Sequence, residues 1–192
     1  MNASLAALTH LSTLAQPTGS DGAAIRVLGI DPGLNITGYG VIDFGHDPKK
    51  PAEMRLVEAG IVRSRAKNSL QSRINEIYSG VREVLDQHNP DVMALEQLFS
   101  HYSRPKTAIL MGHARGAICL SAAQHALPMV HIEPTRVKKI MSGNGRANKS
   151  QMQLAVTRQL QLSSVPDPPD IADALAVAIA GLAMNRSEYE LT

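Results

Sequence analysis

The chain has 192 residues, 44% of them apolar, and a formal net charge of +2. This length and composition suffice for a single domain with a full hydrophobic core. The only cysteine, Cys119, excludes an internal disulfide and cannot build a zinc site by itself, which favours a reducing compartment, the cytoplasm. The longest uncharged apolar run, residues 174–184, is shorter than the roughly 20 residues that span a bilayer, so we expect no membrane segment.

The first half of the chain predicts three strands and one helix. Residues 1–24 contain no Lys or Arg and are rich in small polar residues, which predicts a disordered tail rather than a secretory signal. Strands are predicted at residues 26–31, ended by Pro32 and Gly33, and at residues 39–44 and 56–62. A helix is predicted from its cap, Ser69, through Gln87, because its apolar residues recur with the 3.6-residue period.

The second half predicts two more strands and four helices. The apolar run at residues 92–95 is typical of a central strand, and residues 129–132 make a short one. Helices are predicted at residues 106–126, 135–141, 149–162 and 169–184, with a mobile loop at 142–148 and a C-terminal tail at 187–192. These elements predict an α/β fold in one domain, residues 25–186, with a mixed five-stranded sheet flanked by helices on both faces.

Four acidic residues lie in apolar stretches that contain no neutralising base. They are Asp31, Glu96, Asp170 and Asp173, and no Lys or Arg occurs in residues 27–48, 83–103 or 159–185. A carboxylate that leaves water without a partner is costly, and a bound cation removes this cost. Asp31 and Glu96 follow predicted strands, so their side chains converge if the two strands are neighbours.

Asp170 and Asp173 lie on a helix that is apolar on nearly every side and is therefore predicted to be buried. The alternative is helix capping, which explains Asp170 well and Asp173 less well. Asp31 and Glu96 have their own alternative, the acceptance of backbone hydrogen bonds at strand ends. The four acids together favour a metal site over four separate structural roles.

Residues 104–158 carry nine Lys or Arg and a single acid, Glu133, and so a local charge of +8. Such a segment is either a solvated surface or a nucleic-acid contact. A nuclease needs both a basic surface for the phosphate backbone and carboxylates that place metal ions on one phosphate. The basic segment beside the acidic cluster therefore favours a nuclease.

Several strings resemble the RuvC family of bacterial Holliday junction resolvases. VLGIDPG at residues 27–33 and TGYGVI at 37–42 resemble the family's opening, and ALEQLF at 94–99 resembles its second acidic strand. GHARG at 112–116, VK at 137–138, KSQ at 149–151 and DIADALA at 170–176 match in order and spacing. The resemblance covers residues 25–184 and is specific.

The resemblance implies a ribonuclease H-like fold, a homodimer, and symmetric nicking of four-way DNA junctions with Mg2+ or Mn2+. It also implies partnership with the RuvA and RuvB branch-migration proteins. Asp31, Glu96, Asp170 and Asp173 match the family's metal-binding quartet, and oxygen ligands suit these ions. We expect hydrolysis with two ions in each active site.

The resemblance also assigns DNA contacts. Lys149 aligns with a family lysine implicated in activity and is assigned to the scissile phosphate, and Lys138 is assigned to the DNA backbone; the alternative for both is a solvated lysine. Phe99 matches an aromatic that stacks on a base, or else it caps the core; stacking is favoured only if the chain leaves the sheet after Glu96. The remaining predicted contacts are Arg104, Lys106, Arg115 and Arg146, of which Arg115 could equally cover a helix face.

Two other functions are compatible with parts of the sequence. Asp31-Pro32-Gly33 with Thr37-Gly38 also looks like the first phosphate loop of actin-like ATPases, but those proteins need a second domain and further glycine-rich loops. A junction-binding module without catalysis needs only the basic segment. Unoccupied acids near a DNA phosphate would weaken such binding, which argues against this second alternative.

Overall fold

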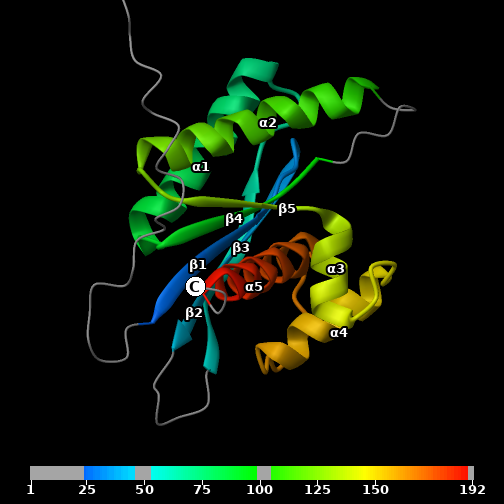
Figure 1. The fold of residues 1–192 in the computed structure, drawn as a ribbon. Coiled ribbons are helices and arrows are strands. Elements are labelled where there is room, and N and C mark those ends of the chain that lie inside the picture. Colours follow the sequence, from blue (N-terminus) through cyan, green and yellow to red (C-terminus); the bar gives the residue numbers. More distant parts are fainter. Residues whose placement is uncertain (1–23, 46–52, 99–104, 190–192) are drawn as a thin grey trace, which may run out of the picture.

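A five-stranded mixed sheet forms the centre of the molecule (Figure 1). The computed structural model describes residues 24–45, 53–98 and 105–189, without the side chains of 185–189. The strands are β1 (Ile25–Asp31), β2 (Ile36–Gly45), β3 (Glu53–Arg63), β4 (Val92–Glu96) and β5 (Met129–Ile132), in the order β3-β2-β1-β4-β5. β2 is antiparallel to β1 and β3, whereas β1, β4 and β5 are parallel. The predicted mixed sheet is confirmed.

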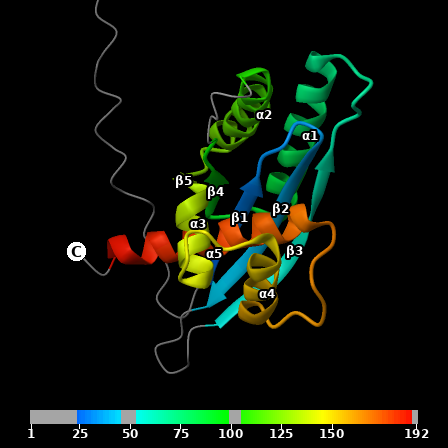
Figure 2. The ribbon, with the colours of Figure 1, turned by 90° about the vertical axis from the view of Figure 1, so that its right-hand side faces the viewer.

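Helices cover both faces of the sheet (Figures 1 and 2). α1 (Leu70–His88) and α2 (Pro105–Gln124) pack on one face, and α3 (Pro134–Ser142), α4 (Lys149–Gln159) and α5 (Pro169–Tyr189) on the other. Strand alternation divides β1 accordingly: Leu28 and Ile30 enter the core under α1 and α2, and Val27 enters the core under α5. In the part of the chain that the structure describes, no helix is long and apolar enough to span a membrane.

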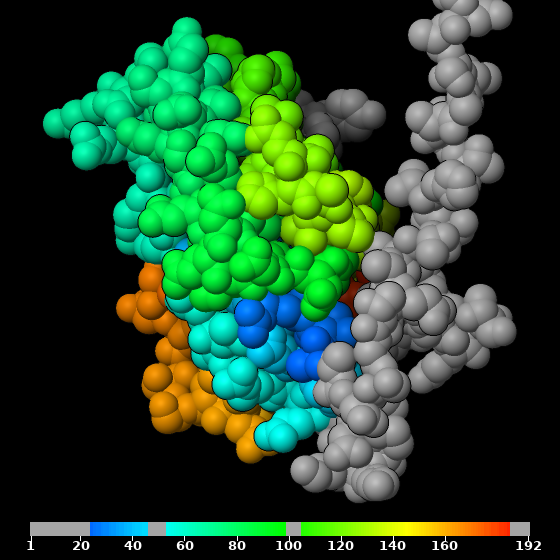
Figure 3. Space-filling view, turned by 90° about the vertical axis from the view of Figure 1, so that its left-hand side faces the viewer, coloured from blue at the N-terminus to red at the C-terminus, as the bar shows by residue number. Residues whose placement is uncertain are grey.

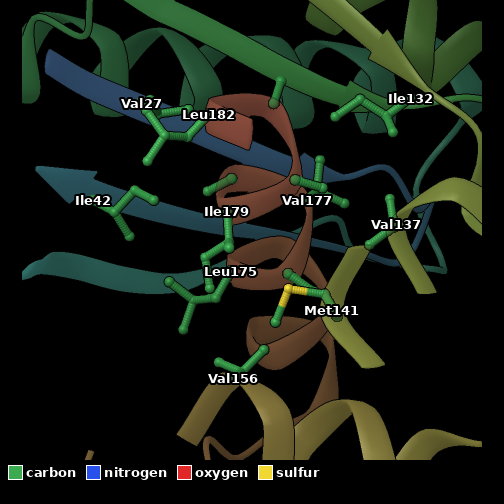
Figure 4. Packing of buried hydrophobic residues seen from close by; sticks show 14 of the residues in the cluster. Val27, Ile42, Ile132, Val137, Met141, Val156, Leu175, Val177, Ile179 and Leu182 are labelled. Atoms are coloured by element: carbon green, nitrogen blue, oxygen red, sulfur yellow. The ribbon is translucent and has the colours of Figure 1, made fainter. Parts of the chain in front are cut away.

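α5 lies directly on the backbone of the strands, because glycines leave room for it. A Cβ on Gly29 would lie 2.3 Å from the carbonyl oxygen of Ala174, and one on Gly38 would lie 2.1 Å from that of Asp170. A Cβ on Gly40 would lie 2.5 Å from the Leu175 side chain. Figure 4 shows α5 crossing the strands among the apolar side chains of this core. The helix therefore rests on β1 and β2 by backbone contact at Gly29 and Gly38, with no side chain between the main chains at these two positions.

The predicted elements are present, with shifted ends. Ser69 caps α1 and accepts a hydrogen bond from the N–H of Ser72, as predicted, and β5 has the predicted bounds. β2 begins three residues before its predicted start, where Thr37 Oγ1 donates to the carbonyl of Gly33, 2.7 Å away, and closes the turn after β1. α4 ends at Gln159 instead of residue 162, and α5 continues to Tyr189, beyond its predicted end at residue 184. The predicted tail, residues 1–24, lies outside the described residues except for Ala24.

An ion-pair cluster holds the end of the sheet where β1 begins, the end that Figure 3 shows. The Arg26 guanidinium donates two hydrogen bonds to the Asp43 carboxylate, at 2.7 and 3.0 Å, and Arg55 donates a third at 3.0 Å. The Asp43 side chain is 10% exposed. Hydrogen bonding from Arg26, reinforced by Arg55, holds the pKa of the Asp43 carboxyl below its usual range, against the opposing effect of burial.

Replacing Asp43 by asparagine should lower the free energy of unfolding by about 2 kcal/mol, because two guanidinium groups lose their anion. The pKa of Asp43 is lowered in the folded state, so its contribution is complete above about pH 4 and is lost as the pH falls further. Urea unfolding at pH 7 and at pH 3 measures both effects. An equal difference between variant and wild type at the two pH values would contradict this assignment.

Candidate active site

Two acids meet at the carboxyl ends of neighbouring parallel strands. Asp31 ends β1 and Glu96 ends β4, and the pairing of Ile30 with Leu95 places the two residues side by side. Strand alternation turns both side chains toward α5, because Val27 and Gly29 in β1 and Ala94 in β4 contact that helix or its core. The condition set by the sequence, that the two strands are neighbours, is met.

The first turn of α5 brings the other two acids to the same place. Gly38, which pairs with Asp31 across β1 and β2, touches the backbone of Asp170. Asp173 lies one turn further along α5 and lines a cleft of about 300 Å³ together with Asp31 and Glu96. Asp170 does not line this cleft, but its charge acts on both Asp31 and Asp173. Residues separated by more than 130 positions in the sequence thus form one acidic cluster.

Burial and mutual repulsion raise the pKa values of the acids in this cluster. Burial, followed by the charges of Glu96, Asp173 and Asp170, raises the pKa of Asp31 to about 8. Burial likewise raises the pKa of Glu96 and of Asp173. Asp31 and Glu96 share a side-chain hydrogen bond. Two adjacent carboxyl groups can form such a bond when one of them is protonated and donates to the other. Carboxylates crowded in this way gain from a cation between them.

Two lysines line the same cleft, and they correct one premise of the sequence analysis. The acids have no basic neighbour in sequence, but Lys149 Nζ lies 3.4 Å from Asp173 Oδ2. The charge of Lys138 partly opposes the rise that burial causes in the pKa of Glu96 and of Asp173. Lys149 begins α4, where Asn148 caps the helix and forms a capping box with Gln151. Lys138 and Lys149 therefore line the cleft with the acids, and their roles in binding DNA stay predictions.

The donor set fits a hard divalent cation, because every acidic ligand offers carboxylate oxygen. As the described side chains stand, no group of three or more His, Cys, Asp or Glu residues has the arrangement of a metal site. The contacts above explain this: Asp31 is hydrogen-bonded to Glu96, and Lys149 holds Asp173. A cation held by Asp31, Glu96 and Asp173 would take the place of the shared proton and of the lysine contact.

Arg115 holds the backbone of Glu96 at the end of β4. The sequence did not predict this role. The Nε of Arg115 donates to the backbone carbonyl of Glu96 at 3.1 Å, and its Nη2 lies 2.7 Å from His131 Nδ1. The residue after Glu96 is also held, since the Gln97 N–H donates to the carbonyl of Ile132 at 2.8 Å. Arg115 was predicted to contact DNA; in the structure its guanidinium is engaged within the protein and fixes the end of β4.

The other predicted DNA contacts lie in several places. Lys106 is exposed at the start of α2, and Arg146 is exposed between α3 and α4. Phe99 and Arg104 lie outside the described residues. β4 ends at Glu96, which is the condition under which base stacking by Phe99 was favoured over a place in the core.

Comparisons with known proteins agree on one family. A sequence model described as crossover junction endodeoxyribonuclease RuvC matches residues 27–181. The RuvC protein of Rhodopirellula baltica is 57% identical over 164 residues, which are 85% of this chain and 89% of that protein. The structure of Thermus thermophilus RuvC superposes with a TM-score of 0.77 at 30% identity, over 85% of this chain and 97% of that one. T. thermophilus RuvC in complex with a Holliday junction substrate gives 0.75 at 28% identity, over 85% and 96%.

Proposed function

The chain belongs to the RuvC family of crossover junction endodeoxyribonucleases, and we propose that Asp31, Glu96, Asp170 and Asp173 are the metal ligands of its active site. It is a structure-specific endonuclease that resolves four-way DNA junctions in recombination and repair, with a ribonuclease H-like fold. The family is metal-dependent. The observation that carries the proposal is the meeting of the acids from β1, β4 and α5, with Lys138 and Lys149 at the rim.

The oxygen-only donor set favours Mg2+ or Mn2+, two in each site, which would neutralise phosphate charge and activate a water. Within this frame Asp31 and Glu96 hold cations at the strand ends, and Asp170 and Asp173 do so from α5. Lys149 exchanges Asp173 for an oxygen of the scissile phosphate, since both are anions within reach of the same ammonium. Lys138 binds the adjoining backbone.

Cleavage of a synthetic four-way junction, compared with a linear duplex of the same sequence, tests the proposal directly. We expect symmetric nicks in the junction with Mg2+ or Mn2+ and none with a chelator. Equal cleavage of the linear duplex would contradict junction specificity, and cleavage without divalent ions would contradict the metal assignment.

The two alternative functions are now less favoured. The described residues form one sheet with its helices, and the relatives named above are junction resolvases. A binding module without catalysis would have no use for three convergent acids of raised pKa.

We also infer a homodimer, since two symmetric nicks call for two active sites. α2 exposes large apolar side chains, with Ile109 62% and Leu120 53% exposed, and Leu70 and Ile74 of α1 line a groove beside it. Sedimentation at working concentrations should therefore show a dimer. Partnership with RuvA and RuvB and a cytoplasmic location follow from the family and belong to the same proposal.

Replacing Arg115 by alanine separates its two possible roles. We expect the cleavage rate at saturating junction to fall about 10- to 100-fold, because the end of β4 that carries Glu96 loses its support. Junction affinity and its salt dependence should stay as in the wild type. His131→Asn, which keeps an acceptor near the position of Nδ1, should lose much less activity. If Arg115 instead contacts a phosphate, affinity would fall and the salt dependence would become shallower.

A further inference from the structure

A second group of exposed bases lies outside the basic segment 104–158. Arg63 ends β3, and Arg65 and Lys67 follow it in the connection to α1; we call these three residues the basic shelf. Residues 59–75 contain four bases and no acid. All three side chains of the shelf are exposed, and among the described residues none of them forms an ion pair.

The basic shelf lies at the same end of the sheet as the carboxylates. β1 and β3 are both antiparallel to β2, so their carboxyl ends coincide, and Gly38 pairs with Asp31 on one side and with Ile61 on the other. With strands about 4.8 Å apart and about 3.3 Å of rise per residue, the Cα atoms of Arg63 and Asp31 are separated by about 12 Å. That distance corresponds to the axial rise of about three or four base pairs of a duplex.

The shelf and the lysines of the active site lie on different sides of the cleft. Figure 2 looks onto this end of the sheet, with the β3–α1 connection at the upper right and α3 and α4 below it and to its left. α5 begins between them. If Lys138 and Lys149 were the only bases that bind the DNA, they would contact it on one side of the cleavage point only.

Hydrogen bonds fix the connection to the turn that follows Asp31. The Ser64 N–H donates to the carbonyl of Asn35 at 3.0 Å, and the Ser64 hydroxyl donates to the carbonyl of Leu34. Arg73, the fourth base, reaches from α1 to the carbonyl of Leu34 at 3.2 Å and to the side chain of Asn35. Arg73 is therefore structural, and the shelf cannot move far relative to Asp31.

Two acids, Glu76 and Glu83, line a hollow together with Arg63 and Arg65, and the carboxylate of Glu76 serves the same anchoring. Glu76 accepts the Arg65 N–H at 2.7 Å and the Asn68 side-chain amide at 2.7 Å. Its carboxylate thus binds the backbone of the connection and not the guanidinium groups. Because its backbone is anchored, the connection loses little backbone freedom when an anion binds.

We propose that the basic shelf binds phosphates of the DNA that leaves the active site on the side away from α3 and α4. This rests on the proposed function and adds a second arm contact to it. Exposed bases are often only solvated; the anchoring beside Asp31 and the lack of an ion pair among the described residues distinguish these three. A four-way junction has arms that diverge at the cleavage point, and cationic surfaces on both sides of the cleft can hold two of them.

The test compares two double variants with the same change of charge. Arg63→Gln with Arg65→Gln removes two bases of the shelf, and Arg55→Gln with Arg82→Gln removes two exposed bases elsewhere. Junction affinity is measured without divalent ions over a range of salt concentrations. For the shelf variant we expect a slope of log affinity against log salt that is shallower by about 1.8, and an affinity about 10- to 100-fold lower near 0.1 M salt. The control should match the wild type.

Two outcomes would overturn the proposal. One is a slope equal to that of the control, and the other is a weaker affinity with an unchanged slope, since lost phosphate contacts must change the slope. Failure of the wild type to cleave junctions would refute the proposed function and leave the slope comparison valid.

Discussion

Asp31→Asn should abolish metal-dependent cleavage of four-way junctions while the variant still binds them. Asp31 is the acid on which Glu96, Asp173 and Asp170 all act, so an uncharged amide there removes the centre of the ligand set. We expect a loss of about 10³-fold or more in the single-turnover rate. Since we propose that Lys and Arg outside the cluster bind the DNA, affinity without divalent ions should be equal to or higher than that of the wild type.

A matched control is Asp86→Asn, which neutralises a carboxylate exposed on α1 beside His125 and Arg82. It should cleave like the wild type. The unfolding free energy of Asp31→Asn, measured without metal, should be unchanged or higher, because the substitution relieves repulsion among buried acids. A variant that cleaves normally would refute the catalytic assignment, and a destabilised one would favour the structural alternative of a carboxylate holding a strand end.

Gly29→Ala should prevent folding or lower the free energy of unfolding by more than about 4 kcal/mol. The new Cβ would lie 2.3 Å from the Ala174 carbonyl oxygen and 2.4 Å from the Ala178 nitrogen, and backbone atoms cannot rotate away. The same substitution at Gly112 of α2, where a Cβ meets no atom within 4 Å, should stabilise by about 0.5 to 1 kcal/mol. Thermal and urea unfolding measure both. A Gly29→Ala protein as stable as the wild type would mean that α5 does not rest on β1.

Local patterns in the sequence predicted most of the fold. The 3.6-residue period and the Ser69 cap located α1, and continuous apolar runs located β4 and β5. β2 and β3 were predicted too short. β2 was predicted to begin at Tyr39 but begins at Ile36, and β3 is an edge strand whose charged residues hide its apolar alternation. Both errors arose where a strand neighbour, and not the local sequence, stabilises the extended chain.

For the candidate site, the sequence predicted which acids matter but not what surrounds them. Burial without a nearby base singled out Asp31 and Glu96, and the structure brings them together. The ion pair of Lys149 with Asp173 and the bond from Arg115 to Glu96 join distant segments, which no local pattern reports. One signal was available: Gly38 and Gly40 are two residues apart in a strand, share a face, and so mark the path of a closely packed helix.

The two cores, one on each face of the sheet, differ in how well they tolerate substitutions, because glycines lie under α5 on one face only. On the α1 and α2 face, side chains such as Leu28, Ile30 and Ile118 interlock, and a change of volume at one can be absorbed by its neighbours. On the α5 face, main chain meets main chain at Gly29 and Gly38, and no rotamer can take up an added atom. We therefore expect the core on the α1 and α2 face to diversify freely among descendants of this chain. The core on the α5 face should change little, and the spacing between the carboxylates of β1 and α5 therefore stays constant.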